Sequence, residues 1–184
     1  MFDRRSLPFH QEVYMSWYVI QVRNGHEKEI AEKCKILIPD TILKECFIPE
    51  FIYQKKYLGT WHEVKAVMFS GYIFMITENI EKLYVELNKI PEFTKVIGKK
   101  QEDIYPLDEN EETFLKSFGK AGHMIEMSTG YIQGDKIYIT KGPLQGKEGL
   151  ITKVDRHKRI AYLHISMFNK ETVTKVGLEI ISKC

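Results

Sequence analysis

Basic side chains cluster in the last quarter of this chain, where they could hold a phosphate backbone. Arg156, His157, Lys158 and Arg159 are consecutive and lie between two apolar runs, which is the pattern of a short turn between strands. On such a turn the side chains fan outward, and the forked guanidinium of arginine binds phosphate oxygens through two donors. The candidate contacts, including lysines on neighbouring loops, are Lys141, Lys147, Lys153, Arg156, His157, Lys158, Arg159 and Lys170. The alternative is that these charges only keep a small domain in solution.

Charge is sorted along the sequence. Residues 134–184 contain ten Lys and Arg against five Asp and Glu, a net charge of +5, whereas the other residues contain seventeen against twenty, a net charge of −3. The C-terminal segment therefore has the sign that attracts a nucleic acid, and the N-terminal segment is expected to use another kind of partner. Chance variation between small domains is the competing explanation.

Patterns for catalysis and metal binding are weak. The sequence has no phosphate loop, dinucleotide fingerprint or nucleophile elbow, and its six histidines are scattered. Acidic residues gather between 102 and 112, but a solvated first turn of a helix explains them better than a catalytic or metal cluster does. The three cysteines have no zinc or disulfide spacing and are expected to be reduced. We expect a binding protein that is not an enzyme and needs no cofactor or metal.

The C-terminal segment is predicted to form a small antiparallel β-barrel. Its glycine-rich loop, residues 141–149, separates short β-branched runs and would let backbone approach a partner closely. The five expected strands are 136–140, 150–154, 160–165, 172–176 and 178–181.

The N-terminal segment alternates strand and helix signals. A helix is expected after Asn24 and Glu27, which stand at capping-box spacing, and should end before Pro39. Another begins at Asp108, where Glu111 completes the same pattern. The remaining expected elements are strands at 17–22, 72–77 and 94–97, a hairpin of 47–57 with 61–67, and a helix at 80–90.

These elements predict an α+β fold in which an antiparallel sheet with packed helices precedes a five-stranded barrel. We expect an N-terminal tail at 1–15, whose first fourteen residues are dispensable, a first domain at 16–118, a linker at 119–133 and a second domain at 134–184. No apolar run approaches the ~20 residues of a membrane span, and no secretory signal is present, so a cytoplasmic location is the default expectation.

Two stretches carry a resemblance to a known family. The glycine-rich loop, Gly142-Pro143-Leu144 with Gly146 to Gly149, resembles the KOW element of the NusG transcription-elongation factors. The run from Trp17 to Val22 with Asn24 to Glu27, and the run from Phe69 to Phe74, look like parts of the family's N-terminal (NGN) domain. Ser70 replaces the usual proline, which indicates a less rigid turn. The basic second domain favours a specialised paralogue of the LoaP and RfaH kind, LoaP in particular.

The resemblance implies a protein that rides on transcribing RNA polymerase. In relatives the central strand presents an apolar patch to the clamp helices of the polymerase, so Phe69, Tyr72 and Phe74 become the candidate polymerase contacts. Period-2 alternation places Tyr72 and Phe74 on one face, although aromatic residues of this kind are more often core. The second domain is expected to bind a structured RNA leader or hairpin, giving processive antitermination by a monomer. The non-template DNA strand is a further candidate contact, and no membrane partner is expected.

Two other functions fit parts of the sequence. A general NusG protein would couple the polymerase to Rho or to the ribosome through its second domain. A ribosome-associated RNA-binding protein would explain the basic barrel, but it would leave the aromatic strand without a role. An enzyme is the third alternative.

Overall fold

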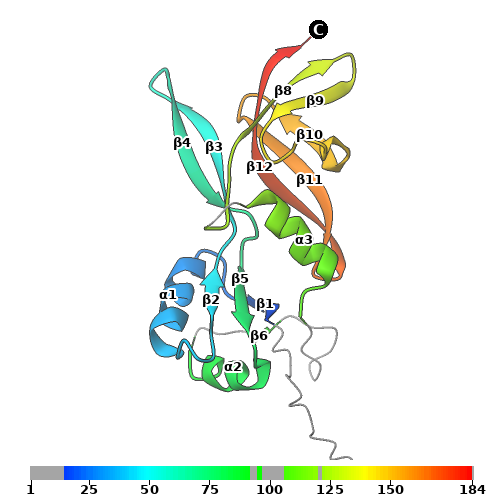
Figure 1. Cartoon of the computed structure of the whole chain (residues 1–184). Coiled ribbons are helices and arrows are strands. Elements are labelled where there is room, and N and C mark those ends of the chain that lie inside the picture. The colour runs from blue at the N-terminus through cyan, green and yellow to red at the C-terminus, as the bar shows by residue number, and fades with distance from the viewer. Residues whose placement is uncertain (1–14, 92–94, 97–105, 120–121, 184) are drawn as a thin grey trace, which may run out of the picture.

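The computed structural model describes residues 15–91, 95–96, 106–119 and 122–183, and it confirms an α+β N-terminal module followed by a β-rich C-terminal module (Figure 1). The tail at 1–14 and two of the acidic residues, Glu102 and Asp103, lie outside the described residues. Within the described part of the chain, no helix is long and apolar enough to cross a membrane.

A four-stranded sheet forms the base of the N-terminal module. Its order is β2-β5-β1-β6, with β2 at Glu45–Phe47, β5 at Tyr72–Thr77, β1 at Ser16–Gln21 and β6 at Lys95–Val96. The predicted edge strand near 94–97 is therefore present as β6, which pairs with β1. Strand alternation sorts the side chains of β1 and β5 onto two faces, as expected for a sheet that is covered on both sides.

The two faces of this sheet have different neighbours. One face packs against α1 (Glu27–Leu37) and α2 (Ile80–Leu87) in a core that includes Ile20, Ile73 and Leu83. The other face presents Trp17 and Phe74 to a second core, which continues into the C-terminal module. The sheet thus separates a helical layer from the interface between the modules.

The start of α1 differs from the prediction. The N-cap is His26, its side chain makes no capping hydrogen bond, and Asn24 does not form the expected capping box. The carboxylate of Glu27 instead accepts a hydrogen bond of 2.6 Å from the backbone N–H of Gly71, before β5. This long-range hydrogen bond joins the start of α1 to the segment before β5 and gives the buried Glu27 carboxylate a partner.

A long hairpin leaves the N-terminal module. Strands β3 (Glu50–Tyr57) and β4 (Thr60–Val67) pair along their whole length, as the sequence predicts, and β7 (Met124–Ile125) adds to β3 in parallel. The connection Leu58-Gly59 has positive φ at both residues, the geometry that matches strand twist in a two-residue turn. The hairpin runs beside the C-terminal sheet (Figure 1).

Helix α3 (Glu109–Phe118) begins with the predicted capping box. Asp108 accepts a hydrogen bond from the Glu111 N–H, and the Glu111 carboxylate accepts one from the Asp108 N–H. Glu111 is nevertheless buried, so this acidic position is not part of a solvated first turn as expected. The apolar side of α3 joins the core that the two modules share, through Leu115 and Phe118.

The C-terminal module is a five-stranded sheet of order β10-β11-β12-β8-β9. Its strands are β8 (Ser128–Gln133), β9 (Lys136–Lys141), β10 (Ile151–Asp155), β11 (Ile160–Met167) and β12 (Lys170–Lys183), with a short 3-10 helix, η1 (Glu148–Leu150), before β10.

Three details of this sheet differ from the sequence prediction. The sheet is not wholly antiparallel as expected, because the last strand, β12, runs in the same direction as β8 and pairs with it in parallel. Residues 128–133, placed in the linker, form β8, whose alternation is interrupted by Gly130; a Cβ there would collide with the carbonyl oxygen of Tyr138. The strands expected at 172–176 and 178–181 are one strand, β12, because Gly177 continues the ladder.

Candidate partner and nucleic-acid interfaces

The predicted aromatic patch lies where the two modules meet. Phe74 is fully buried, Phe69 is 4% exposed, and Tyr72 is half-buried on the same face of β5. The rings of Phe69 and Phe74 are 5.9 Å apart, so the three candidates form one aromatic surface, as the alternation predicts. The patch does not face solvent in this structure.

Phe168, from the turn between β11 and β12, covers the patch. Its ring stacks on Tyr72 with centroids 4.6 Å apart and meets Phe69 edge-on at 5.5 Å. Phe74 lies 5.9 Å away on the third side. Phe168 is 8% exposed, although a turn residue of a barrel would ordinarily face water. The C-terminal module therefore inserts one aromatic ring into the aromatic surface of the N-terminal module.

Hydrogen bonds hold this turn in place. The backbone N–H of Phe168 donates to the buried Glu111 carboxylate at 2.5 Å, and the Thr174 hydroxyl donates to the Met68 carbonyl at 2.7 Å. Phe168 and Asn169 both have positive φ, a conformation that is costly for a bulky side chain. The contacts with the N-terminal module offset that cost.

Lys170, predicted to bind RNA, belongs to this interface. Its ammonium donates to the Tyr72 hydroxyl at 3.2 Å and lies 5.6 Å from the centre of the Tyr72 ring. Because it touches the aromatic patch, it lies with the interface between the modules and not with the basic turn.

The basic turn between β10 and β11 keeps three of its predicted contacts on the surface. The side chains of Arg156, His157 and Lys158 are exposed. Asp155 shapes the turn, because its carboxylate accepts the Lys158 N–H at 3.0 Å and lies 3.8 Å from the Lys158 ammonium. The turn therefore presents a compact cationic surface to solvent.

Arg159, the fourth basic residue of the turn, points to the β3–β4 hairpin. Its guanidinium lies 3.7 Å from the centre of the Trp61 ring, pairs with Glu179 at 2.9 Å and donates to the Gln54 side chain. The Arg159 side chain is only 20% exposed. The structure thus gives Arg159 a role in joining the modules, which sequence spacing alone did not predict.

The other predicted lysines also fall into two groups, exposed lysines and one that packs against the rest of the protein. Lys153 and Lys141 are exposed, whereas Lys147 donates to the Pro143 carbonyl at 3.2 Å and lies over the Phe118 ring of α3. The glycine-rich loop packs against β8 at its start, where Gly142 leaves no room for a Cβ against Ser128, whereas Gly146 and Gly149 have no neighbours within 4 Å of a Cβ position. The structure brings together Lys153, Arg156, His157 and Lys158, and it separates Lys141, Lys147 and Lys170 from them.

Sequence reasoning missed Phe168, Glu111 and Trp61 as interface residues. Asn169 indicates a turn at this point, but no local signal shows that the Phe168 ring is buried. The pairing of Trp61 with Arg159 joins segments nearly a hundred residues apart, and no local pattern encodes it.

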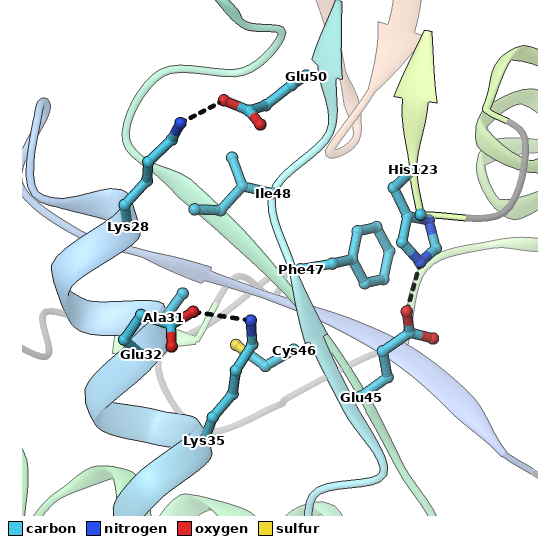
Figure 2. A pocket seen from close by; sticks show the side chains of 11 residues that line it. Lys28, Ala31, Glu32, Lys35, Glu45, Cys46, Phe47, Ile48, Glu50 and His123 are labelled. Atoms are coloured by element: carbon cyan, nitrogen blue, oxygen red, sulfur yellow. Dashed lines mark hydrogen bonds and ion pairs between the residues drawn. The ribbon is translucent and has the colours of Figure 1, made fainter.

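A cavity of about 470 Å³ lies between α1, β2 and the segment before β7 (Figure 2). Polar side chains are paired across it: the Lys28 ammonium lies 2.7 Å from the Glu50 carboxylate, and His123 Nε2 lies 2.6 Å from the Glu45 carboxylate. The His123 ring also stacks on Phe47 at 3.4 Å. No group of three or more His, Cys, Asp or Glu that could hold a metal occurs among the described residues.

Two buried thiols lie next to this cavity. A hydrogen bond with Cys46 lowers the pKa of Cys34, whereas the same bond, together with burial, raises the pKa of Cys46. Neither cysteine forms a disulfide in this structure.

Comparison with known proteins finds similarity to the same family along both modules. The family model described as transcription termination factor nusG matches residues 15–115, and the KOW motif matches residues 133–164. The transcription termination/antitermination protein NusG of Buchnera aphidicola is 21% identical over 95% of this chain and 99% of its own length. That of Campylobacter jejuni is 23% identical over 87% and 92%.

A solved structure, described as domain interaction in Thermotoga maritima NusG, has a TM-score of 0.54 over 91% of this chain and 94% of that one, at 18% identity. It supports the fold. Because the nusG model covers more than half of the sequence and the KOW motif follows it, the chain belongs to the NusG family of transcription factors.

Proposed function

We propose that this protein is a transcription elongation and processive antitermination factor with two binding surfaces. The N-terminal module binds RNA polymerase, at its clamp helices, through Phe69, Tyr72 and Phe74. The C-terminal module binds a structured RNA in the nascent transcript through Arg156, His157 and Lys158. In this proposal the chain is a specialised family member of the LoaP kind, acting where it is recruited by its RNA.

The observation that carries the polymerase contact is the insertion of Phe168 into the aromatic patch. A surface that accepts an aromatic ring from another module, at stacking distance from Tyr72, has the shape and chemistry to accept an apolar side chain from a partner helix. Burial of one such side chain contributes about 1.5 to 3 kcal/mol. A polymerase helix would therefore compete with Phe168 for the same site.

Binding then requires the modules to move apart at this point. A ligand for the uncovered patch shifts the chain toward an open state, and its apparent affinity falls in proportion to the fraction that is open. Two hydrogen bonds between the modules set how small that fraction is: the Phe168 N–H donates to the Glu111 carboxylate, and the Thr174 hydroxyl on β12 donates to the Met68 carbonyl. The closed arrangement thus lowers the apparent affinity for the polymerase without any change in the residues of the aromatic patch.

The RNA contact is supported by charge and exposure. The C-terminal segment has a net charge of +5, and its turn residues stay exposed while the modules are closed. Phosphate contacts need no opening step, so RNA can bind before the polymerase does. The non-template DNA strand is a second candidate for the same surface, because the phosphate contacts of an exposed turn do not by themselves distinguish RNA from DNA.

A general NusG function is the second candidate, favoured by the names of the relatives from Buchnera and Campylobacter. In that case the C-terminal module would couple the polymerase to Rho or to the ribosome, and replacing Arg156 and Lys158 would leave RNA-dependent readthrough unchanged. A ribosome-associated protein would sediment with ribosomes and not with polymerase.

Gel filtration with purified RNA polymerase tests the proposal. The wild-type chain is expected to co-elute with the polymerase, and Tyr72→Ala is expected to lose about ten- to a hundredfold in affinity, the equivalent of one buried side chain. Tyr138→Ala is the matched control, because Tyr138 is a partly exposed tyrosine on β9. Failure of both the wild type and a Phe168→Ala variant to co-elute would overturn the polymerase contact.

A further inference from the structure

A lysine that the sequence did not single out extends the cationic surface of the basic turn. On the three strands β10, β11 and β12, Lys153, Tyr162 and Lys175 are direct cross-strand partners. Both ammonium groups lie 5.5 Å from the centre of the Tyr162 ring, one from each side. The strands therefore hold two cations on either side of one aromatic ring, on the same strand pair that leads into the basic turn.

The same surface continues in the other direction onto the N-terminal module. Arg159, at the end of the basic turn, stacks on Trp61 of the hairpin, and the Lys56 ammonium lies 5.9 Å from the same ring. Trp61 is 38% exposed although a guanidinium covers part of it, and Lys56 is exposed. The hairpin thus places an accessible indole and a lysine beside a cationic turn from the other module.

We infer that one RNA-binding surface spans both modules, running from Lys175 across Tyr162, Lys153 and the basic turn to Trp61 and Lys56. This inference rests on the proposed RNA contact of the C-terminal module and extends it to residues of the N-terminal hairpin. The partner is a structured RNA: phosphates of the stem contact the lysines, and an unpaired base stacks on the exposed part of Trp61.

Residue chemistry along this path suits RNA. Single-stranded nucleic acid is held by cations that follow the backbone and by aromatic rings on which bases stack, and RNA loops offer unstacked bases. Three acidic residues lie close to the path, namely Asp155, Glu179 and Glu63. Glu179 is paired with Arg159 and Asp155 with Lys158, so these two carboxylates are partly neutralised, and the exposed lysines at either end set the sign of the surface.

Because the path crosses from one module to the other, it is complete only while Arg159 holds the hairpin against the turn. The RNA should therefore bind best while Arg159 contacts the hairpin. This contact lies at the opposite end of β11 from the Phe168 turn that the polymerase displaces, so RNA binding does not require that turn to stay closed. If the RNA-binding surface were confined to the basic turn, substitutions in the hairpin would leave RNA affinity unchanged. The inference can therefore be tested with hairpin variants.

The test uses the full chain and a fluorescein-labelled RNA stem-loop with an unpaired loop, with binding measured by anisotropy at several salt concentrations. Lys175→Gln and Lys56→Gln each remove one cation from an end of the path. Loss of one phosphate contact makes the negative slope of log affinity against log salt shallower by about 0.7 to 0.9. When the salt concentration rises fourfold, the factor by which affinity falls should therefore be about three times smaller for each variant than for the wild type. Lys82→Gln, on the exposed side of α2, is the matched control and should keep the wild-type slope.

Trp61→Ala tests the stacking contact and is expected to weaken binding about fivefold or more at every salt concentration, with little change in slope. Trp61→Phe, which keeps a ring, should recover most of that loss. Circular dichroism and thermal melting of each variant establish that it is folded.

The outcomes separate this inference from the proposed function. If the wild type does not bind the stem-loop above the level of the Arg156→Ala, Lys158→Ala double variant, the RNA contact itself fails. If that double variant loses binding while Lys175→Gln, Lys56→Gln and Trp61→Ala all match the wild type, the C-terminal turn binds RNA alone and the surface spanning both modules is refuted. Equal losses for Lys56→Gln and Lys82→Gln would also refute it, since only non-specific charge would then be measured.

Discussion

Replacing Phe168 by alanine should increase the affinity of the protein for RNA polymerase, the opposite of what deletion of an aromatic binding residue usually does. Phe168 is 8% exposed and contacts Phe69, Tyr72 and Phe74. Truncating a buried phenylalanine to alanine costs about 3 to 5 kcal/mol, and a value near 3 corresponds to a shift of about 150-fold from closed to open. The Phe168 backbone has positive φ, so the polar contacts of the turn should weaken as well once the ring no longer holds it.

Apparent polymerase affinity should rise with the open fraction until opening is complete. The assay is anisotropy of the fluorescently labelled chain titrated with polymerase core enzyme, in the wild type, Phe168→Ala and a Val173→Ala control. Val173 lies on the same strand, β12, and is 63% exposed, so its truncation should change nothing. An unchanged or reduced affinity for Phe168→Ala, in a variant shown to be folded, would refute the reasoning that Phe168 and the polymerase use one site.

Three further predictions concern how the fold is held together. Gly177→Ala would place a Cβ against the Ile52 carbonyl, so we expect a loss of about 1 to 3 kcal/mol and a lower melting temperature, and an unchanged melting curve would contradict the packing. Burial raises the pKa of Glu27, but hydrogen bonds from the Gly71 N–H and other backbone donors outweigh it and leave the pKa below its usual 4.5. The wild type should therefore be more stable than Glu27→Gln at pH 7 and lose that advantage as pH falls below 4.5. Urea unfolding of both proteins at pH 7 and at a pH below 4.5 measures this difference. Arg159→Lys keeps the charge but not the planar stacking on the Trp61 indole, so about 1 kcal/mol of that contact should be lost, with a change in tryptophan fluorescence. An identical spectrum and stability would count against the contact between Arg159 and the hairpin.

Local sequence signals predicted the elements whose determinants are local. The alternation along the β3–β4 hairpin and the capping box at Asp108 both depend on residues a few positions apart, and both are present. The same capping pattern at Asn24 gave no capping box: the N-cap is His26, and the Glu27 carboxylate accepts a hydrogen bond from Gly71, forty-four residues away. A motif of four residues cannot indicate which of its side chains a distant backbone donor will take.

The interfaces were only half predictable for the same reason. Tyr72 and Phe74 share a face because strands alternate, and the basic turn is exposed because turns lie on the surface. The packing of the two modules decides the rest: Phe168 covers the aromatic face, and the Arg159 side chain points away from the basic turn to the hairpin. Gly177 was predicted to separate two strands, whereas it continues β12 at a point where the Ile52 carbonyl of the hairpin leaves no room for a Cβ.

The most direct test of the account is single-round transcription by purified polymerase through a terminator, on templates with and without an upstream segment encoding the RNA stem-loop. The account predicts that the wild-type protein increases readthrough chiefly on the template that encodes the stem-loop, and that the Arg156→Ala, Lys158→Ala double variant loses this preference. Readthrough that is the same with and without the protein on both templates would contradict it.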